Sequence, residues 1–162
     1  MPLVQATLAT NLESMEPVDN EADAIDNFAT AFDDYFQGSS VIGTPVSGTT
    51  AAAKTAMKGS MTGLLETDGA AAITAGVIAY WGVIIPAVAT LWVLVPPLTV
   101  GTPPPTLAAI TAALTATFAS NTSGKLSLAA AAATVAAAIH ANQLGGTATQ
   151  ATLPSPTVQP IL

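Results

Sequence analysis

The sequence predicts a mainly α-helical fold: a small helical bundle with extended proline-containing connectors and arms, and a few short strands. Three observations predict it. Alanine is the commonest apolar residue, several stretches carry apolar residues at spacings of three and four, and clusters of Gly or Pro separate those stretches. A chain of 162 residues is long enough for one domain with its own core, and it is short for two. We therefore expect one domain with tails.

The N-terminal segment 1–18 is predicted to be an arm with a short helix, from about Gln5 to Met15, that stops at Pro17. The strongest helical signal follows it. Apolar side chains from Ile25 to Phe36 fall on one helical stripe, and Asp19 or Asn20 can cap the first turn. The sequence therefore predicts an amphipathic helix that starts the main domain, residues 19–146.

The middle of this domain alternates between connectors and helices. Residues 39–48 indicate an extended connector or short strand, and a helix is predicted over 49–65. An apolar helix is expected over 70–83, with Pro86 ending or kinking it. The stretch 87–100, rich in Val and Leu, is expected to be extended.

A stiff polyproline linker, Thr102 to Pro105, leads into a predicted helix at about 107–118. After a turn at 121–124, an Ala-rich helix is expected over 127–141, and Gly145-Gly146 follows its end. The uncharged remainder, 147–162, is predicted to be an extended C-terminal arm. Segments 49–85 and 105–146 share a pattern of helix, turn and Ala-rich helix, which suggests a weak internal repeat.

Composition excludes some partners and favours others. Charged residues make up 8% of the chain, against roughly a quarter in an average soluble domain. The net charge of -7 and the absence of arginine argue against direct nucleic-acid binding, which needs clustered basic residues. Aromatic residues are only 5%, so one copy buries little area, and an uncharged Ala/Thr surface costs little to desolvate. These features favour association with other copies.

No catalytic, cofactor or metal site is predicted, so we do not expect an enzyme. His140, the one histidine, follows Ser127 at a separation that does not place them on adjacent turns of one helix face, and no triad results. Four carboxylates lack the spacing of a calcium loop and are interpreted as a solvated helix face: Asp23, Asp26, Asp33 and Asp34. Gly59 and Gly63 match a small-xxx-small pattern that allows close helix packing.

The large side chains and the C-terminal residues are the interface candidates. The aromatic ones anchor either the core of one chain or a contact between subunits, and the sequence leaves both alternatives open. The candidates are Phe28, Phe32, Tyr35, Tyr80, Trp81, Trp92, Phe118, Ile161 and Leu162.

Residues 70–95 raise the main alternative, a membrane-active lysis protein of the holin type, because the stretch is uncharged and long enough to span a bilayer. Pro86 near its middle and the absence of flanking Lys or Arg argue against insertion. We therefore expect no membrane contact.

The chain resembles small virion proteins of tailed bacteriophages, in style and across most of its length. The features that carry the resemblance are Ala24-Ile25-Asp26-Asn27-Phe28, Ala79-Tyr80-Trp81-Gly82 and Pro103-Pro104-Pro105-Thr106-Leu107. It implies a structural subunit of the neck, tail, baseplate or capsid exterior, made in the host cytoplasm and located in the virion. Its implied partners are copies of itself and other virion proteins, over which proline-containing arms would lie.

Overall fold

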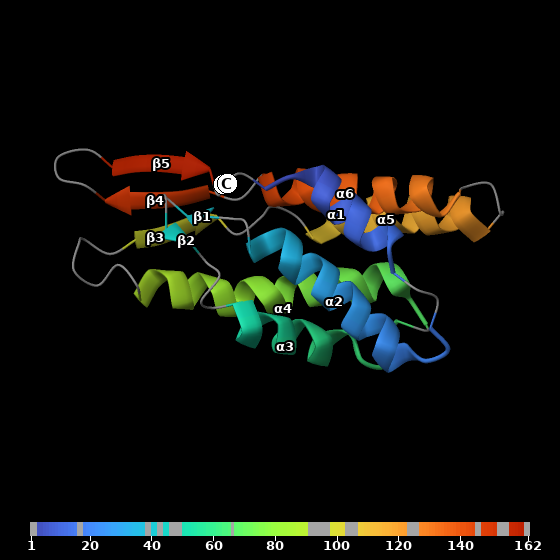
Figure 1. The fold of residues 1–162 in the computed structure, drawn as a ribbon. Coiled ribbons are helices and arrows are strands. Elements are labelled where there is room, and N and C mark those ends of the chain that lie inside the picture. The colour runs from blue at the N-terminus through green and yellow to red at the C-terminus, as the bar shows by residue number, and fades with distance from the viewer. Residues whose placement is uncertain are drawn as a thin grey trace.

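The computed structural model describes residues 3–15, 18–37, 40–41, 44–45, 50–65, 67–90, 98–102, 107–122, 127–144, 147–151 and 156–160. Within these ranges six helices form a bundle and five short strands form two small antiparallel sheets (Figure 1). The prediction of a mainly helical fold is confirmed. The helices are α1 Gln5–Glu13, α2 Glu21–Gln37, α3 Thr50–Met61, α4 Gly69–Thr90, α5 Leu107–Thr122 and α6 Leu128–Leu144. The strands are β1 Ser40–Val41, β2 Thr44–Pro45, β3 Leu98–Thr102, β4 Thr147–Ala151 and β5 Pro156–Pro160.

Three helices begin at a polar residue that caps the first turn. The Asn20 side chain accepts a hydrogen bond from the Asp23 amide at 2.9 Å and donates one to the Asp23 carboxylate at 2.7 Å. Asp68 accepts from the Ala71 amide at 3.0 Å at the start of α4, and Ser127 accepts from the Ala130 amide at 3.2 Å at the start of α6. Each cap satisfies an amide that has no partner within its own helix.

Helix α2 buries the stripe that its sequence predicts. Ile25, Phe28, Phe32 and Phe36 are all buried, and they face a core to which every helix contributes. Helix α2 contacts α1 on one side and α3 on the other, as Figure 1 shows for the blue and teal helices. Tertiary packing of this stripe, rather than helix propensity alone, stabilises α2.

Helix α4 contacts α3, α5 and β3, and it has one buried and one exposed face. It continues through Pro86 to Thr90, so of the two predicted effects, ending or kinking the helix, the first is wrong, and residues 87–90 are helical rather than extended. Both Pro86 and Gly82, whose carbonyl loses its usual donor, lie on the exposed side of the helix. Water can bond that carbonyl there, and the missing hydrogen bond therefore does not terminate the helix.

Helices α3 and α4 approach each other closely at Gly76. A Cβ atom placed there would lie 2.8 Å from Met61 Sδ and 3.1 Å from Met57 Cγ. The predicted pair Gly59 and Gly63 does not have this role, because a Cβ atom on either would meet nothing within 4 Å. Gly63 instead adopts a φ of 78° in the turn after α3, a conformation that favours glycine.

The C-terminal residues are extended, but they pair within the chain rather than forming a free arm. Strands β4 and β5 make an antiparallel hairpin, and β4 also pairs with β3, giving the order β3-β4-β5. This sheet lies at one end of the bundle beside the last part of α4 (Figure 1). Strand β5 begins with Pro156 and ends with Pro160, which lack amide hydrogens and so limit further pairing at that edge.

Other sequence predictions have mixed outcomes. Helix α5 extends to Thr122, into the predicted turn at 121–124. The polyproline residues 103–105 lie outside the described residues. Segments 49–85 and 105–146 each contain a pair of helices, α3 with α4 and α5 with α6, and their common origin stays a prediction.

Candidate functional site

A buried carboxylate lies in the middle of the aromatic core. Asp33, on α2, is only 6% exposed, and its Oδ1 accepts a hydrogen bond of 2.7 Å from the Tyr80 hydroxyl of α4. Its Oδ2 accepts a bond of 2.8 Å from the Gln37 amide nitrogen. Burial of an unpaired carboxylate is costly, so these donors are what make the position tolerable. The solvated face predicted for the four α2 carboxylates is therefore wrong for Asp33.

Two further polar contacts join α6 to this core. The Tyr35 hydroxyl and His140 Nδ1 lie 2.8 Å apart, and Trp81 Nε1 donates to Gln143 Oε1 at 2.5 Å. Several aromatic pairs of this core meet edge to face: the ring centroids of Phe32 and Tyr80, for example, are 5.0 Å apart at an interplanar angle of 77°. Aromatic and polar contacts together fix how α2, α4 and α6 pack.

The structure places five of the interface candidates in the core of a single chain. None of the five is more than 6% exposed: Phe28, Phe32, Tyr35, Tyr80 and Trp81. The sequence left open whether these residues anchor the core of one chain or a contact between subunits, and the structure places these five in the core. Trp92, Ile161 and Leu162 lie outside the described residues. Phe118 is on α5, and the position of its side chain is outside the description.

The buried cluster supports packing better than catalysis. His140 contacts a tyrosine rather than a serine, and its other ring contact is the same tyrosine, edge to face. Burial raises the pKa of the Tyr35 hydroxyl, and burial together with Asp33 raises the pKa of Tyr80, so neither is a ready base. Among the described residues, no three His, Cys, Asp or Glu side chains gather as metal ligands would.

The raised pKa of Tyr80 predicts a loss of stability in alkali. Above the usual tyrosine pKa of 10.0 the unfolded chain releases the hydroxyl proton, while the folded chain retains it. Stability is therefore complete below that pH and falls as the pH rises above it, by up to about 1.4 kcal/mol per pH unit for each such group. Urea unfolding between about pH 8 and pH 11 measures the slope.

Tyr80→Phe should make that slope shallower. It should also lower the free energy of unfolding at neutral pH by about 1–3 kcal/mol, because Asp33 loses a buried donor. Tyr35→Phe is the matched control for the loss at neutral pH, since Tyr35 is equally buried but contacts His140 instead of a carboxylate; its pKa is also raised by burial, so its replacement should make the slope shallower as well. An unchanged slope in both variants would contradict the assignment.

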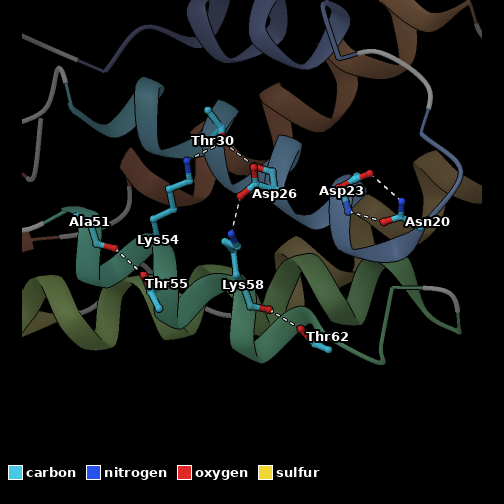
Figure 2. Close-up of polar contacts among 9 residues, drawn as sticks. All are labelled: Asn20, Asp23, Asp26, Thr30, Ala51, Lys54, Thr55, Lys58 and Thr62. Atoms are coloured by element: carbon cyan, nitrogen blue, oxygen red, sulfur yellow. Dashed lines mark hydrogen bonds and ion pairs between the residues drawn. The ribbon is translucent and has the colours of Figure 1, made fainter.

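Helices α2 and α3 meet along a polar seam on the surface (Figure 2). Lys58 Nζ lies 2.6 Å from Asp26 Oδ1, and Lys54 Nζ donates to the Thr30 hydroxyl at 2.7 Å. The hydrogen bond from Lys58 is the main reason that the pKa of Asp26 lies below its usual value. About half of each side chain in this ion pair is exposed, so solvent screens it and its contribution to stability is small.

Charge divides the molecule into two parts. Every acidic residue of the chain lies between Glu13 and Asp68, and Lys54 and Lys58 are in the same half. Helices α4, α5 and α6, as described, contain no Asp, Glu, Lys or Arg, and His140 is their one titratable group near neutrality. Large apolar side chains are exposed on two of them, Ile78 on α4 and Leu128 on α6.

Two hollows mark the surface near α1 and α2. One, of about 320 Å³, has a mixed polar lining that includes Asn11, Asn27 and Asp34. The other, of about 160 Å³, is apolar and is formed by side chains of α1, α2, α4 and α6. We call the second hollow the apolar groove; its lining residues are Leu12, Met15, Phe28, Ile73, Leu128, Ala131, Ala132 and Val135.

Among the described residues, one helix could cross a membrane by length and composition. The qualifying stretch of α4 is Gly69–Ala87, with a mean hydropathy of 1.8, and half of it is buried inside the bundle. A core helix of a soluble protein passes the same test, so this stretch is weak evidence for a membrane span.

Comparisons with protein families, with curated proteins and with solved structures find no match for this chain.

Sequence reasoning missed Asp33 and Gln143 as buried polar residues and missed the apolar groove. A signal for Asp33 was present: it lies four residues after Ala29 and three before Phe36, both buried, so it shares their face of α2. No comparable signal exists for Gln143, because the apolar periodicity of the Ala-rich α6 is too weak to indicate its buried side.

Proposed function

We propose that this chain is a structural subunit that acts through protein–protein packing within a tailed-phage virion. The observation that carries the proposal is the charge-free surface of α4, α5 and α6, where Ala, Thr and single large apolar residues face outward. A surface of this kind loses little solvation energy when another protein covers it. The acidic half, around α2 and α3, remains available to face water.

The phage assignment itself is supported by the sequence resemblance, and its test is the composition of the particle. Mass spectrometry of purified virions should detect peptides of this chain at a fixed ratio to the major coat protein through successive gradient purifications. Loss of those peptides on purification would count against the proposal. The ratio would also indicate whether the subunit occupies a site of low copy number, such as the neck, or a repeated one.

A second candidate function, a membrane-active lysis protein, is favoured by the apolar stretch Gly69–Ala87. Against it, α4 holds Tyr80 in a hydrogen bond with Asp33 of α2 and Trp81 in one with Gln143 of α6, and insertion into a bilayer would break both. Flotation with liposomes separates the candidates. The packing subunit should stay at the bottom of the gradient, and a lysis protein should float.

A further inference from the structure

The inner face of α6 continues beyond the part of the chain that covers it. Leu128, Ala132, Val135 and Ile139 repeat at spacings of four, three and four, which places them on one side of the helix. The last three are at most 8% exposed, whereas Leu128 is 61% exposed. Leu128, the first residue of this stripe, is thus left without cover, although its side chain is as large as that of the buried Ile139.

The apolar groove lies directly beside this residue. Its floor consists of buried side chains from four helices, including Leu12, Phe28 and Ile73, and Leu128 stands at its rim. No charged or polar side chain is among the lining residues. A projecting apolar side chain and a hollow that fits an apolar side chain therefore belong to the same small patch.

We propose that two copies of this chain associate through the apolar groove, the Leu128 side chain of each entering the groove of the other. This inference deepens the proposed function, on which it rests, by naming a contact between copies. Two-fold pairing requires one patch that is complementary to itself, and a projection beside a matching hollow meets that requirement. The hollow of about 160 Å³ is large enough for a leucine side chain.

The shape of the patch, rather than charge, indicates a second copy as the occupant. Each copy carries a net charge of -7, so two copies repel at long range and have to meet where charge is sparse. Helix α6, which supplies half of the groove lining, carries no formal charge over its described length. Pairing there is driven by apolar burial, and added salt should strengthen it by screening the remaining repulsion between the acidic halves.

Sedimentation equilibrium of the full chain tests this contact. The wild-type chain should form dimers at micromolar concentration, more tightly in high salt than in low salt. Leu128→Asp should weaken the dimer by roughly a hundredfold or more, because the contact loses two buried leucine side chains, one from each copy. Ile78→Asp is the matched control: Ile78 is also an exposed isolated apolar residue, at 46%, but it lies on α4 outside the groove, and the dimer should persist.

Cross-linking locates the contact directly, because the chain has no cysteine. Ala129→Cys copies, which keep Leu128 and carry the thiol at the neighbouring exposed position, should be joined rapidly by a short bis-maleimide, and Ile78→Cys copies should not. Thermal unfolding of each variant shows that the fold persists, as expected for exposed positions. A monomeric wild-type chain, a dimer unaffected by Leu128→Asp, or equal cross-linking at both positions would each overturn the inference.

These outcomes are separable from failure of the proposed function. A monomeric chain whose peptides are nevertheless constant in purified virions would refute the groove contact and leave the structural role intact. A groove-dependent dimer that is absent from virions would do the reverse.

Discussion

Replacing Ile84 by alanine should lower the free energy of unfolding by about 2–5 kcal/mol. Ile84 lies on α4 and is fully buried in the bundle core, so the substitution removes apolar contacts and leaves a cavity. Its matched control is Ile78→Ala, a substitution of the same residue type on the same helix. Ile78 is 46% exposed, and its replacement should change stability by less than about 0.5 kcal/mol. Urea unfolding of both variants measures the difference.

This pair of variants also bears on the choice between the two candidate functions. In a packed bundle in water, one face of α4 is covered by α3 and α5 and the other is not, which makes the two isoleucines unequal. In a bilayer, lipid would cover the exposed face as well, so replacing either isoleucine by alanine would remove a comparable amount of apolar contact. Equal effects of Ile84→Ala and Ile78→Ala, measured in water, would contradict the described packing of α4.

The N-terminal half of the fold is the more predictable from sequence, because charge contrasts with apolar residues there. The helix from Glu21 to Gln37 has an apolar stripe, an Asn20 cap and acidic residues in its first turn, and all three signals agree. Its start is accordingly within two residues of the cap that the sequence indicates. The Tyr80 partner of Asp33 was not predictable, since it comes from a different helix, α4, whereas Gln37 lies four residues after Asp33 on α2.

The C-terminal half is harder to predict from sequence because its helices are apolar or Ala-rich on every side. Nothing in the sequence distinguishes Ile78 from Ile84, although one is exposed and the other is buried. Helix α4 lies between two other helices and a strand, and such an element has no single apolar stripe to read. The candidate groove is missed for this reason: its lining comes from four helices, and only their packing brings those residues together.

The C-terminal residues illustrate a third limit, long-range pairing. Proline and threonine recur there, which indicates extended backbone, and the strands β4 and β5 are extended. The second partner of β4 is β3, which lies far away in sequence, with Leu98 opposite Gln150 and Thr102 opposite Thr147. Register of this kind depends on how two helices, α5 and α6, return the chain to the same end of the bundle.

Replacing Gly76 by leucine should destabilise the bundle by about 1–3 kcal/mol or more. Even a Cβ atom at this position would lie 2.8 Å from Met61 Sδ and 2.9 Å from Met61 Cγ. A methyl group already requires Met61 to shift and Met57, whose Cγ would lie 3.1 Å away, to give slightly. About 1 kcal/mol of gained helix propensity offsets part of this crowding, so Gly76→Ala should cost less stability than Gly76→Leu. A leucine requires larger movements of both methionines, which are fully buried.

Gly82 provides the matched control six residues further along the same helix. A Cβ atom there would meet nothing within 4 Å, so Gly82→Leu should stabilise the chain by about 0.5–1 kcal/mol through helix propensity alone. Thermal and urea unfolding of these three variants therefore separate crowding from propensity, because only the Gly76 series should lose stability as the side chain grows. If the Gly76→Leu chain were as stable as the Gly82→Leu chain, α3 and α4 would not approach each other at Gly76. The described packing of α4 against α3 would then be wrong.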